Sequence, residues 1–258
     1  MPTIDADGCP INVEIEGPER APTLMFSNSL GTNLHMWDEQ AKHLIKKFRV
    51  LRYDQRGHGK SGAPKTPYTL DRLGKDALAV LDGLKIERAH FCGLSMGGFT
   101  GMWLGRRAPK RIDKLILSNT AAKIGDSVLW NSRILTVLGK GMNAIVDGVL
   151  ERWFTKAFRE KAPQAVARIR DMLLATAPHG YAGCSAAIRD MDQRWDIGAI
   201  GLPTLIIAGA HDPATTMKDA ELIESQIAGS KLVKLDTAHL SNIEQAKQYT
   251  ETIEKFLG

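Results

Sequence analysis

The sequence lacks several features that would place it in a specialised class of proteins. It has only three cysteines, Cys9, Cys92 and Cys184, and no CxxC pair, so neither a disulfide framework nor a metal site is expected. No window approaches the ~18 uninterrupted apolar residues of a membrane span, so no membrane partner is expected. The stretch from Met1 to Pro10 lacks the basic start and apolar run of a secretory signal. We therefore expect a cytoplasmic protein.

Positive charge is in slight excess but is not concentrated. The formal net charge is +5, and the lysines and arginines are scattered among acidic residues. No base-stacking motif accompanies them, so no nucleic-acid partner is expected. Hydrophobic residues make up 43% and charged residues 24% of the 258 residues, which is ordinary for a globular chain. The length suits one large α/β domain with a modest insertion.

Short apolar runs alternate with longer amphipathic stretches. Several runs are too apolar for a half-exposed strand, which indicates parallel strands covered on both faces. We expect such strands at Thr23–Phe26, Phe48–Tyr53, Arg88–Cys92, Leu115–Leu117, Thr204–Ala208 and Leu232–Leu235, an edge strand at Ile11–Ile15, and helices from Thr69 to Leu84, Gly97 to Ala108 and Leu240 to Leu257. This alternation predicts an α/β fold with a mostly parallel central sheet flanked by helices.

One interval breaks this alternation. From Leu117 to Thr204 the chain runs far longer than an ordinary βαβ crossover of ~30 residues. Helical spacing interrupted by glycine and proline predicts three or four short helices there. We therefore expect a core made of residues 1–121 and 198–258, and a helical cap insertion at residues 122–197 that lies over the sheet as a lid.

The motif Gly93-Leu94-Ser95-Met96-Gly97-Gly98 carries the strongest chemical signal. It follows an expected strand and begins an expected helix. A strand-to-helix turn of this kind holds its central serine at strained backbone angles, and the flanking glycines let neighbouring backbone pass closely. The turn would present the Ser95 hydroxyl above the carboxyl end of the sheet. We interpret Ser95 as a nucleophile.

A serine hydroxyl needs a base to remove its proton, and the base needs an acid to orient it. On such a turn the partners follow in the order serine, acid, histidine. Asp212 opens the loop after one buried strand, and His239 follows the last strand. Asp236 is the rival acid, but it lies within a strand end, so Asp212 is preferred. Of the other histidines, His58 is interpreted as part of a shaping loop.

An acyl-transfer site also needs two backbone N–H groups that face the developing oxyanion. Met96, the residue after the serine, should supply one of them. The loop Ser27-Asn28-Ser29-Leu30-Gly31-Thr32 should supply the other. If Trp37 anchors this loop, the N–H of Leu30 is the best candidate in the loop for the second oxyanion donor.

With these residues in place, the chain resembles the α/β-hydrolase superfamily over nearly its whole length, and more narrowly the bacterial 3-oxoadipate enol-lactonases. The motif around Ser95 supports the broader resemblance. The narrower one depends on Ser27-Asn28-Ser29-Leu30-Gly31-Thr32, on Met36-Trp37-Asp38, and on Tyr53-Asp54-Gln55-Arg56-Gly57-His58-Gly59-Lys60-Ser61. Many hydrolases have His-Gly where this chain has Asn28-Ser29, and the Ser-Asn-Ser-Leu-Gly-Thr run is typical of the lactonases.

The resemblance implies hydrolysis of 3-oxoadipate enol-lactone to 3-oxoadipate in aromatic-compound catabolism, with no cofactor and no metal. Ser95 would attack the lactone carbonyl, or His239 would activate water directly, and the sequence leaves both routes open. The lactone carries a carboxylate side arm, so a cationic side chain should line the pocket. Arg133 is our candidate for the anion and Trp130 for the ring, with Arg152, Arg189 and Arg194 as open rivals.

Three other functions remain open at this stage. A general carboxylesterase or a hydrolase of carbon–carbon bonds would use the same triad on the same fold. A ligand receptor that kept the hydrolase fold is the non-enzymatic alternative, although it would not need a complete triad. Whether the chain forms a homo-oligomer is also open.

Overall fold

The computed structural model describes residues 3–258, which form an eight-stranded sheet in the order β1-β2-β4-β3-β5-β6-β7-β8. The strands are β1 (Thr3–Asp5), β2 (Pro10–Glu16), β3 (Thr23–Ser27), β4 (Arg49–Tyr53), β5 (Ala89–Leu94), β6 (Ile112–Ser118), β7 (Thr204–Gly209) and β8 (Lys231–Leu235). Strands β3 to β8 are parallel to their neighbours, whereas β2 pairs antiparallel with β4. The mostly parallel sheet and an antiparallel strand at Ile11–Ile15 are thus confirmed, but this strand is not the edge, because β1 pairs with β2 on its outer side. Strand β1 was not expected, because three residues are too few to show a period.

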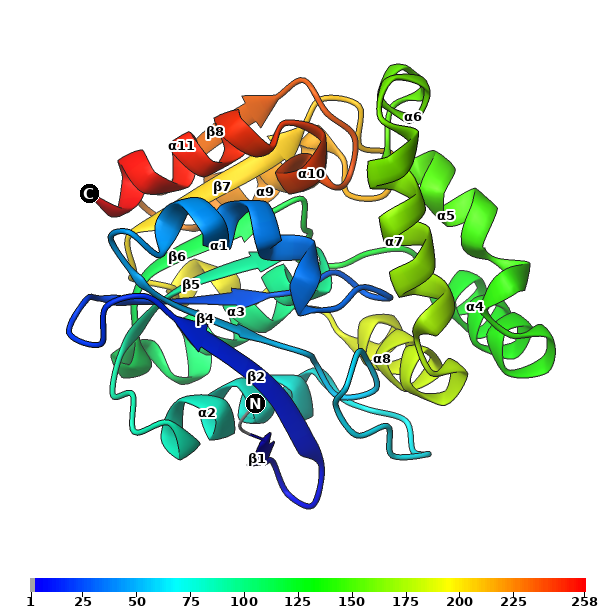
Figure 1. Ribbon diagram of the computed structural model, residues 1–258, viewed down its shortest axis with the longest axis horizontal. Coiled ribbons are helices and arrows are strands. Elements are labelled where there is room, and N and C mark those ends of the chain that lie inside the picture. The colour runs from blue at the N-terminus through cyan, green and yellow to red at the C-terminus, as the bar shows by residue number, and fades with distance from the viewer. Residues whose placement is uncertain (1–2) are drawn as a thin grey trace.

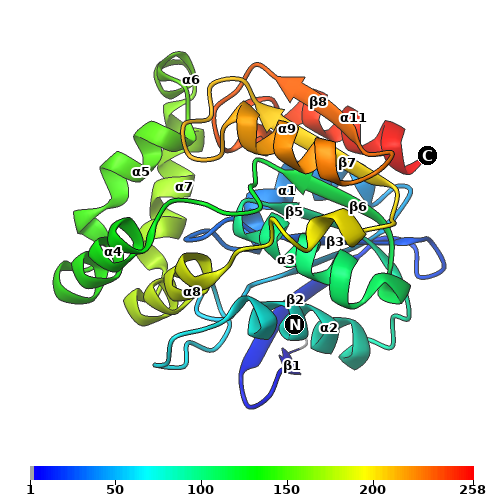
Figure 2. The ribbon, with the colours of Figure 1, turned by 180° about the vertical axis from the view of Figure 1, so that it is seen from behind.

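Helices cover both faces of the sheet. Helices α1 (Asp38–Leu44) and α11 (Ala246–Leu257) lie on one face. Helices α2 (Leu70–Gly83), α3 (Met96–Arg107) and α9 (Met217–Gln226) lie on the other, as the two opposite views show (Figures 1 and 2). The Thr69 side chain accepts a hydrogen bond from the Arg72 N–H and begins α2, as predicted. Because both faces are covered, β3 and β5 are buried along their whole length.

The expected continuous helix from Leu240 to Leu257 is wrong. It is broken into α10 (Ser241–Glu244) and α11, with Gln245 between them at φ −129° and ψ 57°. The physical reason lies in Glu244, whose carboxylate accepts hydrogen bonds from the Ala238 N–H and from Thr155. These tertiary contacts outweigh the helical periodicity of the sequence at this point.

Between β6 and β7 the chain forms α4 (Ser127–Lys140), α5 (Val146–Trp153), α6 (Lys156–Lys161), α7 (Pro163–Ala175) and α8 (Pro178–Asp190). These are five helices rather than the three or four predicted, because α6 is a short separate turn of helix capped by Thr155. They gather at one end of the sheet, on the right of Figure 1. We call helices α4 to α8 the cap; its status as a separate unit with boundaries at 122 and 197 stays a prediction. Across residues 3–258 we find no helix with both the length and the apolar character needed to span a membrane.

The cap is fastened to the loop after β8. The Leu240 N–H donates to the Trp153 carbonyl at 3.1 Å. The Glu244 carboxylate bridges the two parts, because it accepts hydrogen bonds from Thr155 in the cap and from the Ala238 N–H at 2.9 Å in the β8 loop (residues 236–240). The β8 loop therefore depends on the cap for its position.

The cap also packs against the turn after β4. Gly57 has φ +80°, and its backbone packs directly on Gly180 in α8. A Cβ atom on Gly57 would lie 2.4 Å from the Gly180 Cα, which is far inside van der Waals contact. Nearby, the Tyr68 N–H donates to the Gly183 carbonyl at 3.1 Å. Only glycine suits position 57, for both its backbone angle and its packing.

We predict that Gly57→Ala lowers the free energy of unfolding by about 1–3 kcal/mol, since it combines a positive φ with a clash between backbone atoms. Gly139→Ala is the control, because Gly139 lies inside α4 and nothing stands within 4 Å of its added Cβ. The control should raise the free energy of unfolding by ~0.5–1 kcal/mol. Urea unfolding of both variants measures this, and equal stability of Gly57→Ala and the wild type would contradict the packing described here.

Candidate active site

Ser95 lies between β5 and α3, in the sharp turn that the sequence predicted. Its backbone has φ 58° and ψ −114°, in the region that non-glycine residues rarely adopt. The turn is held from both sides: the Ser95 N–H donates to the Ser118 carbonyl at 2.9 Å, and the Thr120 hydroxyl donates to the Ser95 carbonyl at 2.9 Å. These bonds from the end of β6 fix the strained residue in place.

The glycines of this turn allow the close packing that the motif indicated. A Cβ atom on Gly93 would lie 2.1 Å from the Gly97 carbonyl oxygen. A Cβ atom on Gly97 would lie 2.1 Å from the Ser27 carbonyl oxygen. Helix α3 can therefore begin directly against the ends of β3 and β5, with Ser95 at its amino end.

His239 and Asp212 come together as the sequence predicted. His239 Nδ1 lies 2.7 Å from Asp212 Oδ2, and both side chains are buried. The Asp212 carboxylate accepts three further kinds of hydrogen bond: from the Ala214 and Thr215 N–H groups at 2.8 and 3.0 Å, from the Thr215 hydroxyl at 2.7 Å, and from the Asn119 amide at 3.2 Å. Five donors therefore fix the plane of this carboxylate.

Asp212 stays ionised despite its burial. Burial alone would raise its pKa, but the His239 imidazole beside it and the hydrogen bonds from His239 and Thr215 outweigh burial and lower the pKa below its ordinary value. An ionised carboxylate at Nδ1 requires a proton on that nitrogen. Nε2 of a neutral His239 is then left as the basic atom.

The rival acid lies elsewhere. Asp236 is 82% exposed and pairs with His211 at 2.7 Å on the surface. Neither residue lies on the cavity wall that carries Ser95 and His239. The preference for Asp212 over Asp236 therefore agrees with the geometry.

The N–H groups of Met96 and Leu30 remain our candidates for an oxyanion site. Met96 is the first residue of α3, so its N–H has no partner within the helix. Leu30 lies in the loop after β3 (residues 28–33, the β3 loop), and its N–H donates no hydrogen bond to any part of the chain that the structure describes. Asn28 holds this loop, since its amide donates to the Tyr53 carbonyl at 2.8 Å and accepts from Trp37 at 2.9 Å. Trp37 is thus the anchor that the sequence indicated.

A cavity of about 370 Å³ lies between the sheet and the cap. Ser95, His239 and Leu30 lie on its core side. The cap side is formed by Trp130, Arg133, Arg152, Trp153 and Tyr181, among others. Trp153 stacks on His239 with ring centroids 6.3 Å apart. Met96 and Asp212 do not line the cavity, so Met96 can act there only through its backbone.

The cavity carries two arginines and no acidic side chain. The Arg133 guanidinium lies over the Trp130 ring at 5.3 Å and donates to the Tyr181 hydroxyl at 3.4 Å. Arg152 forms no ion pair with any acid among residues 3–258, and burial together with the neighbouring Arg133 lowers its pKa. Arg133 likewise forms no ion pair within the described residues, and two such cations make a site that favours an anion.

The two remaining arginine candidates are not in the cavity. Arg189 pairs with Asp190 at 2.7 Å, and Arg194 pairs with Asp192 at 2.7 Å. Both pairs are on the surface and neither guanidinium lines the cavity. The structure therefore brings Arg133 and Arg152 together and leaves Arg189 and Arg194 outside.

Comparison with known proteins decides the family. Residues 22–180 match the alpha/beta hydrolase fold family. The chain belongs to the α/β-hydrolase family. It is 41% and 40% identical to two proteins of Acinetobacter baylyi named 3-oxoadipate enol-lactonase 2 and 1, over 98% and 97% of this chain and 94% of each relative. It also superposes on the crystal structure of the enol-lactonase from Burkholderia xenovorans LB400 with a TM-score of 0.98, at 45% identity over 99% of both chains.

Some residues of this hydrolase site were not identified from the sequence. Asn119 and Thr215 both bond Asp212, and Tyr181 lies in the cavity beside Arg133. Asn119 directly follows β6, and the carboxyl ends of parallel strands converge, so its position in the sequence did carry a signal. Tyr181 comes from the cap, where the sequence gives no register relative to the sheet.

We predict that Asp212→Asn lowers kcat of this hydrolase by about 10²–10⁴-fold, because an amide at this position no longer stabilises the imidazolium that forms on His239. Asp236→Asn is the matched control, since it makes the same change in the exposed acid, and its kcat should equal that of the wild type. Steady-state hydrolysis of p-nitrophenyl acetate measures both variants. A large loss in Asp236→Asn with none in Asp212→Asn would reverse the assignment of the acid.

Proposed function

We propose that this hydrolase opens 3-oxoadipate enol-lactone with water to give 3-oxoadipate, in aromatic-compound catabolism. The observation that carries the proposal is the cavity itself, which is lined by Ser95, His239, Arg133 and Arg152 and by no acidic side chain. A small ester that also bears a carboxylate matches both halves of that cavity. The names of the relatives from Acinetobacter and Burkholderia support the same substrate.

Ser95 acts as the nucleophile in this proposal. His239 Nε2 takes the hydroxyl proton while Ser95 Oγ bonds to the lactone carbonyl carbon, and Asp212 stabilises the imidazolium. The negative carbonyl oxygen is held by the N–H groups of Leu30 and Met96. The proposal favours this covalent route over direct attack by water, because the strained turn presents Ser95 at the amino end of α3.

Collapse of the tetrahedral intermediate breaks the bond between the acyl carbon and the ring oxygen. The leaving enolate takes the proton from His239 and becomes the ketone, while its chain stays attached through the acyl group on Ser95. Water then gives one proton to His239 as its oxygen bonds to this acyl carbon. Collapse breaks the bond between the acyl carbon and Ser95 Oγ, and His239 returns its proton to Oγ. The new carboxylic acid releases its proton to solvent, so the product leaves with two carboxylates.

The carboxylate side arm binds Arg133 and Arg152. Arg133 is held by Trp130 and Tyr181, so its guanidinium loses little freedom when it binds. Arg152 gains the counter-ion that it lacks in the described chain. The Trp130 ring, buried and held by a bond from its Nε1 to the Ile124 carbonyl at 3.0 Å, forms a wall for the lactone ring.

The other expectations stay predictions. We propose a cytoplasmic location, a small anionic lactone as the partner, and no nucleic-acid or membrane partner. The state of assembly, monomer or homo-oligomer, is to be measured by light scattering. The absence of a cofactor or metal in the reaction likewise remains part of this proposal.

The test of the function is turnover of freshly generated 3-oxoadipate enol-lactone against p-nitrophenyl acetate. We expect kcat/KM of ~10⁴–10⁸ M⁻¹s⁻¹ for the lactone, far above the ester. Ser95→Ala should lose at least ~10³-fold of both activities. Fast ester cleavage with negligible lactone turnover would leave the triad in place and refute the substrate. Full activity of Ser95→Ala would refute the nucleophile.

The arginine pair gives a separate prediction. Arg133→Met and Arg152→Met should each lower kcat/KM for the lactone about 10–100-fold, as expected for a lost hydrogen bond to a charged group. The same variants should change p-nitrophenyl acetate hydrolysis less than about threefold, because that ester carries no carboxylate. Arg189→Met is the control and should match the wild type with both substrates. Equal losses for both substrates in the two cavity variants would contradict a role in carboxylate binding.

A further inference from the structure

His58 lies outside the cavity, yet it touches the loop that carries Leu30. The side chain is 1% exposed and sits in the turn that follows β4. Its Nδ1 is 3.1 Å from the Arg56 carbonyl oxygen. On the other side of the ring, the Gly31 N–H donates to Nε2 at 2.8 Å. The ring therefore links the β4 turn to the β3 loop.

These two contacts define the protonation state of the ring. A carbonyl oxygen can only accept, so Nδ1 must carry the proton. A backbone N–H can only donate, so Nε2 must be bare. If the ring were an imidazolium, its Nε2–H would point at the Gly31 N–H, and neither group could accept from the other. His58 is thus a neutral acceptor with its proton on Nδ1.

The surroundings of the ring agree with a neutral state. Burial lowers the pKa of His58, while the Arg56 carbonyl and the Asp54 carboxylate act in the opposite direction and only partly offset it. From the cap, the Cys184 thiol lies 4.0 Å from Nδ1. Asp54 is already engaged, since its carboxylate accepts from the Leu34 N–H at 2.8 Å and from the Lys60 N–H at 2.9 Å.

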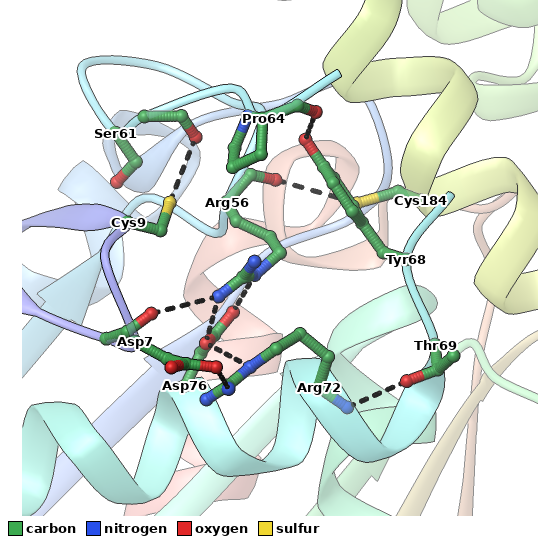
Figure 3. A network of polar contacts seen from close by, with 12 residues as sticks. Asp7, Cys9, Arg56, Ser61, Pro64, Tyr68, Thr69, Arg72, Asp76 and Cys184 are labelled. Carbon is green, nitrogen blue, oxygen red and sulfur yellow. Dashed lines mark hydrogen bonds and ion pairs between the residues drawn. The ribbon is translucent and has the colours of Figure 1, made fainter. Parts of the chain in front are cut away.

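The Arg56 end of this link is firmly held. Figure 3 shows the Arg56 guanidinium against Asp76, with Arg72 on the same carboxylate. Arg56 Nη2 donates to Asp76 Oδ1 at 2.6 Å, and Arg72 Nε donates to the same oxygen at 3.0 Å. The Cys184 thiol donates to the Arg56 carbonyl at 3.6 Å, also drawn in Figure 3. A buried ion pair and a cap residue thus fix the carbonyl that orients His58.

The Gly31 end is held by the cap as well. Gly31 has φ +84°, and a Cβ atom there would lie 2.3 Å from Leu173 Cδ1 in α7. The Thr176 hydroxyl oxygen lies 3.2 Å from the Gly31 carbonyl oxygen and 3.0 Å from the Met172 carbonyl oxygen, so its one proton is shared between the two. Thr176 thus contacts the carbonyl of Gly31, and His58 is the acceptor of its N–H. Without the His58 acceptor, that buried N–H would lack a partner and the loop would shift to find one.

We propose that His58 is a positioning residue, whose neutral ring holds the Gly31 N–H and thereby keeps the adjacent Leu30 N–H aimed at the oxyanion. The inference rests on the proposed role of Leu30 in the reaction. It extends that role to a residue that does not contact the cavity. Since oxyanion donors act on the transition state more than on the bound ester, loss of His58 should lower kcat more than it changes KM.

The test compares His58→Phe with His58→Gln on p-nitrophenyl acetate, so that its result does not depend on the identity of the lactone. Phenylalanine fills the space but cannot accept a bond, and we expect kcat to fall ~10²-fold or more with KM changed less than about threefold. Glutamine can accept from the Gly31 N–H and donate to the Arg56 carbonyl, and kcat should recover to within about tenfold of the wild type. His90→Phe, the same change in another buried histidine, should leave kcat unchanged.

A folded His58→Phe with wild-type kcat would overturn the proposal, as would equal losses in the phenylalanine and glutamine variants. If His58→Phe does not fold, ¹⁵N NMR of the imidazole nitrogens in the wild type decides the question. At pH 7 we expect a neutral His58 ring protonated at Nδ1, identified by the signal that His58→Gln lacks. A proton on Nε2, or on both nitrogens, would overturn the proposal without reference to any activity.

Stability against pH provides a second readout. Because the pKa of folded His58 lies below its ordinary value of 6.5, the unfolded chain binds more protons between the two values. The His58 contribution to stability is therefore complete above pH 6.5 and is lost as the pH falls. His58→Gln should remove this part of the acid sensitivity, so its unfolding midpoint should decline less than that of the wild type between pH 7.5 and 5. An unchanged or steeper decline in His58→Gln would contradict a neutral buried ring.

Discussion

The backbone of Ser95 is the constraint on which the rest of the site depends. A residue with a side chain at φ 58° costs on the order of 1–3 kcal/mol, and the fold sustains it through bonds from Ser118 and Thr120 at the end of β6. The same turn brings Gly97 against the end of β3, where the β3 loop begins. One strained residue thus lies where the end of β5, the first turn of α3 and the beginning of the β3 loop meet.

The cap contributes to this geometry as well as to the cavity. It bonds the β8 loop through Glu244 and packs on the β3 loop through Leu173 and Thr176. Both loops carry groups to which we assign roles in the reaction. The same helices bring two arginines and two tryptophans over Ser95. A change in the cap can therefore alter catalysis by moving either loop, in addition to altering which substrate fits.

The central sheet and the turn around Ser95 could be predicted from the sequence, because their signals are local. The turn around Ser95 is encoded by adjacent glycines, and buried parallel strands appear as continuous apolar runs. Contacts between elements were harder to predict. The place of Asn119 after β6 indicated the carboxyl edge of the sheet but not its bond to Asp212, and Arg152 could not be preferred over its rivals without the register of the cap. The break at Gln245 was missed because the helical period of the sequence continues through it, whereas a tertiary contact of the preceding residue decides the structure.

The most direct measurement compares 3-oxoadipate enol-lactone with its methyl ester, which has the same ring and no charge on the side arm. The proposed reaction requires both an acyl-transfer site at Ser95 and a cationic wall at Arg133 and Arg152. We predict that kcat/KM for the free acid exceeds that for the methyl ester by about 10²-fold or more, as two charged hydrogen bonds would give. Equal kcat/KM for the two lactones would contradict recognition of the anion and leave a hydrolase of neutral esters.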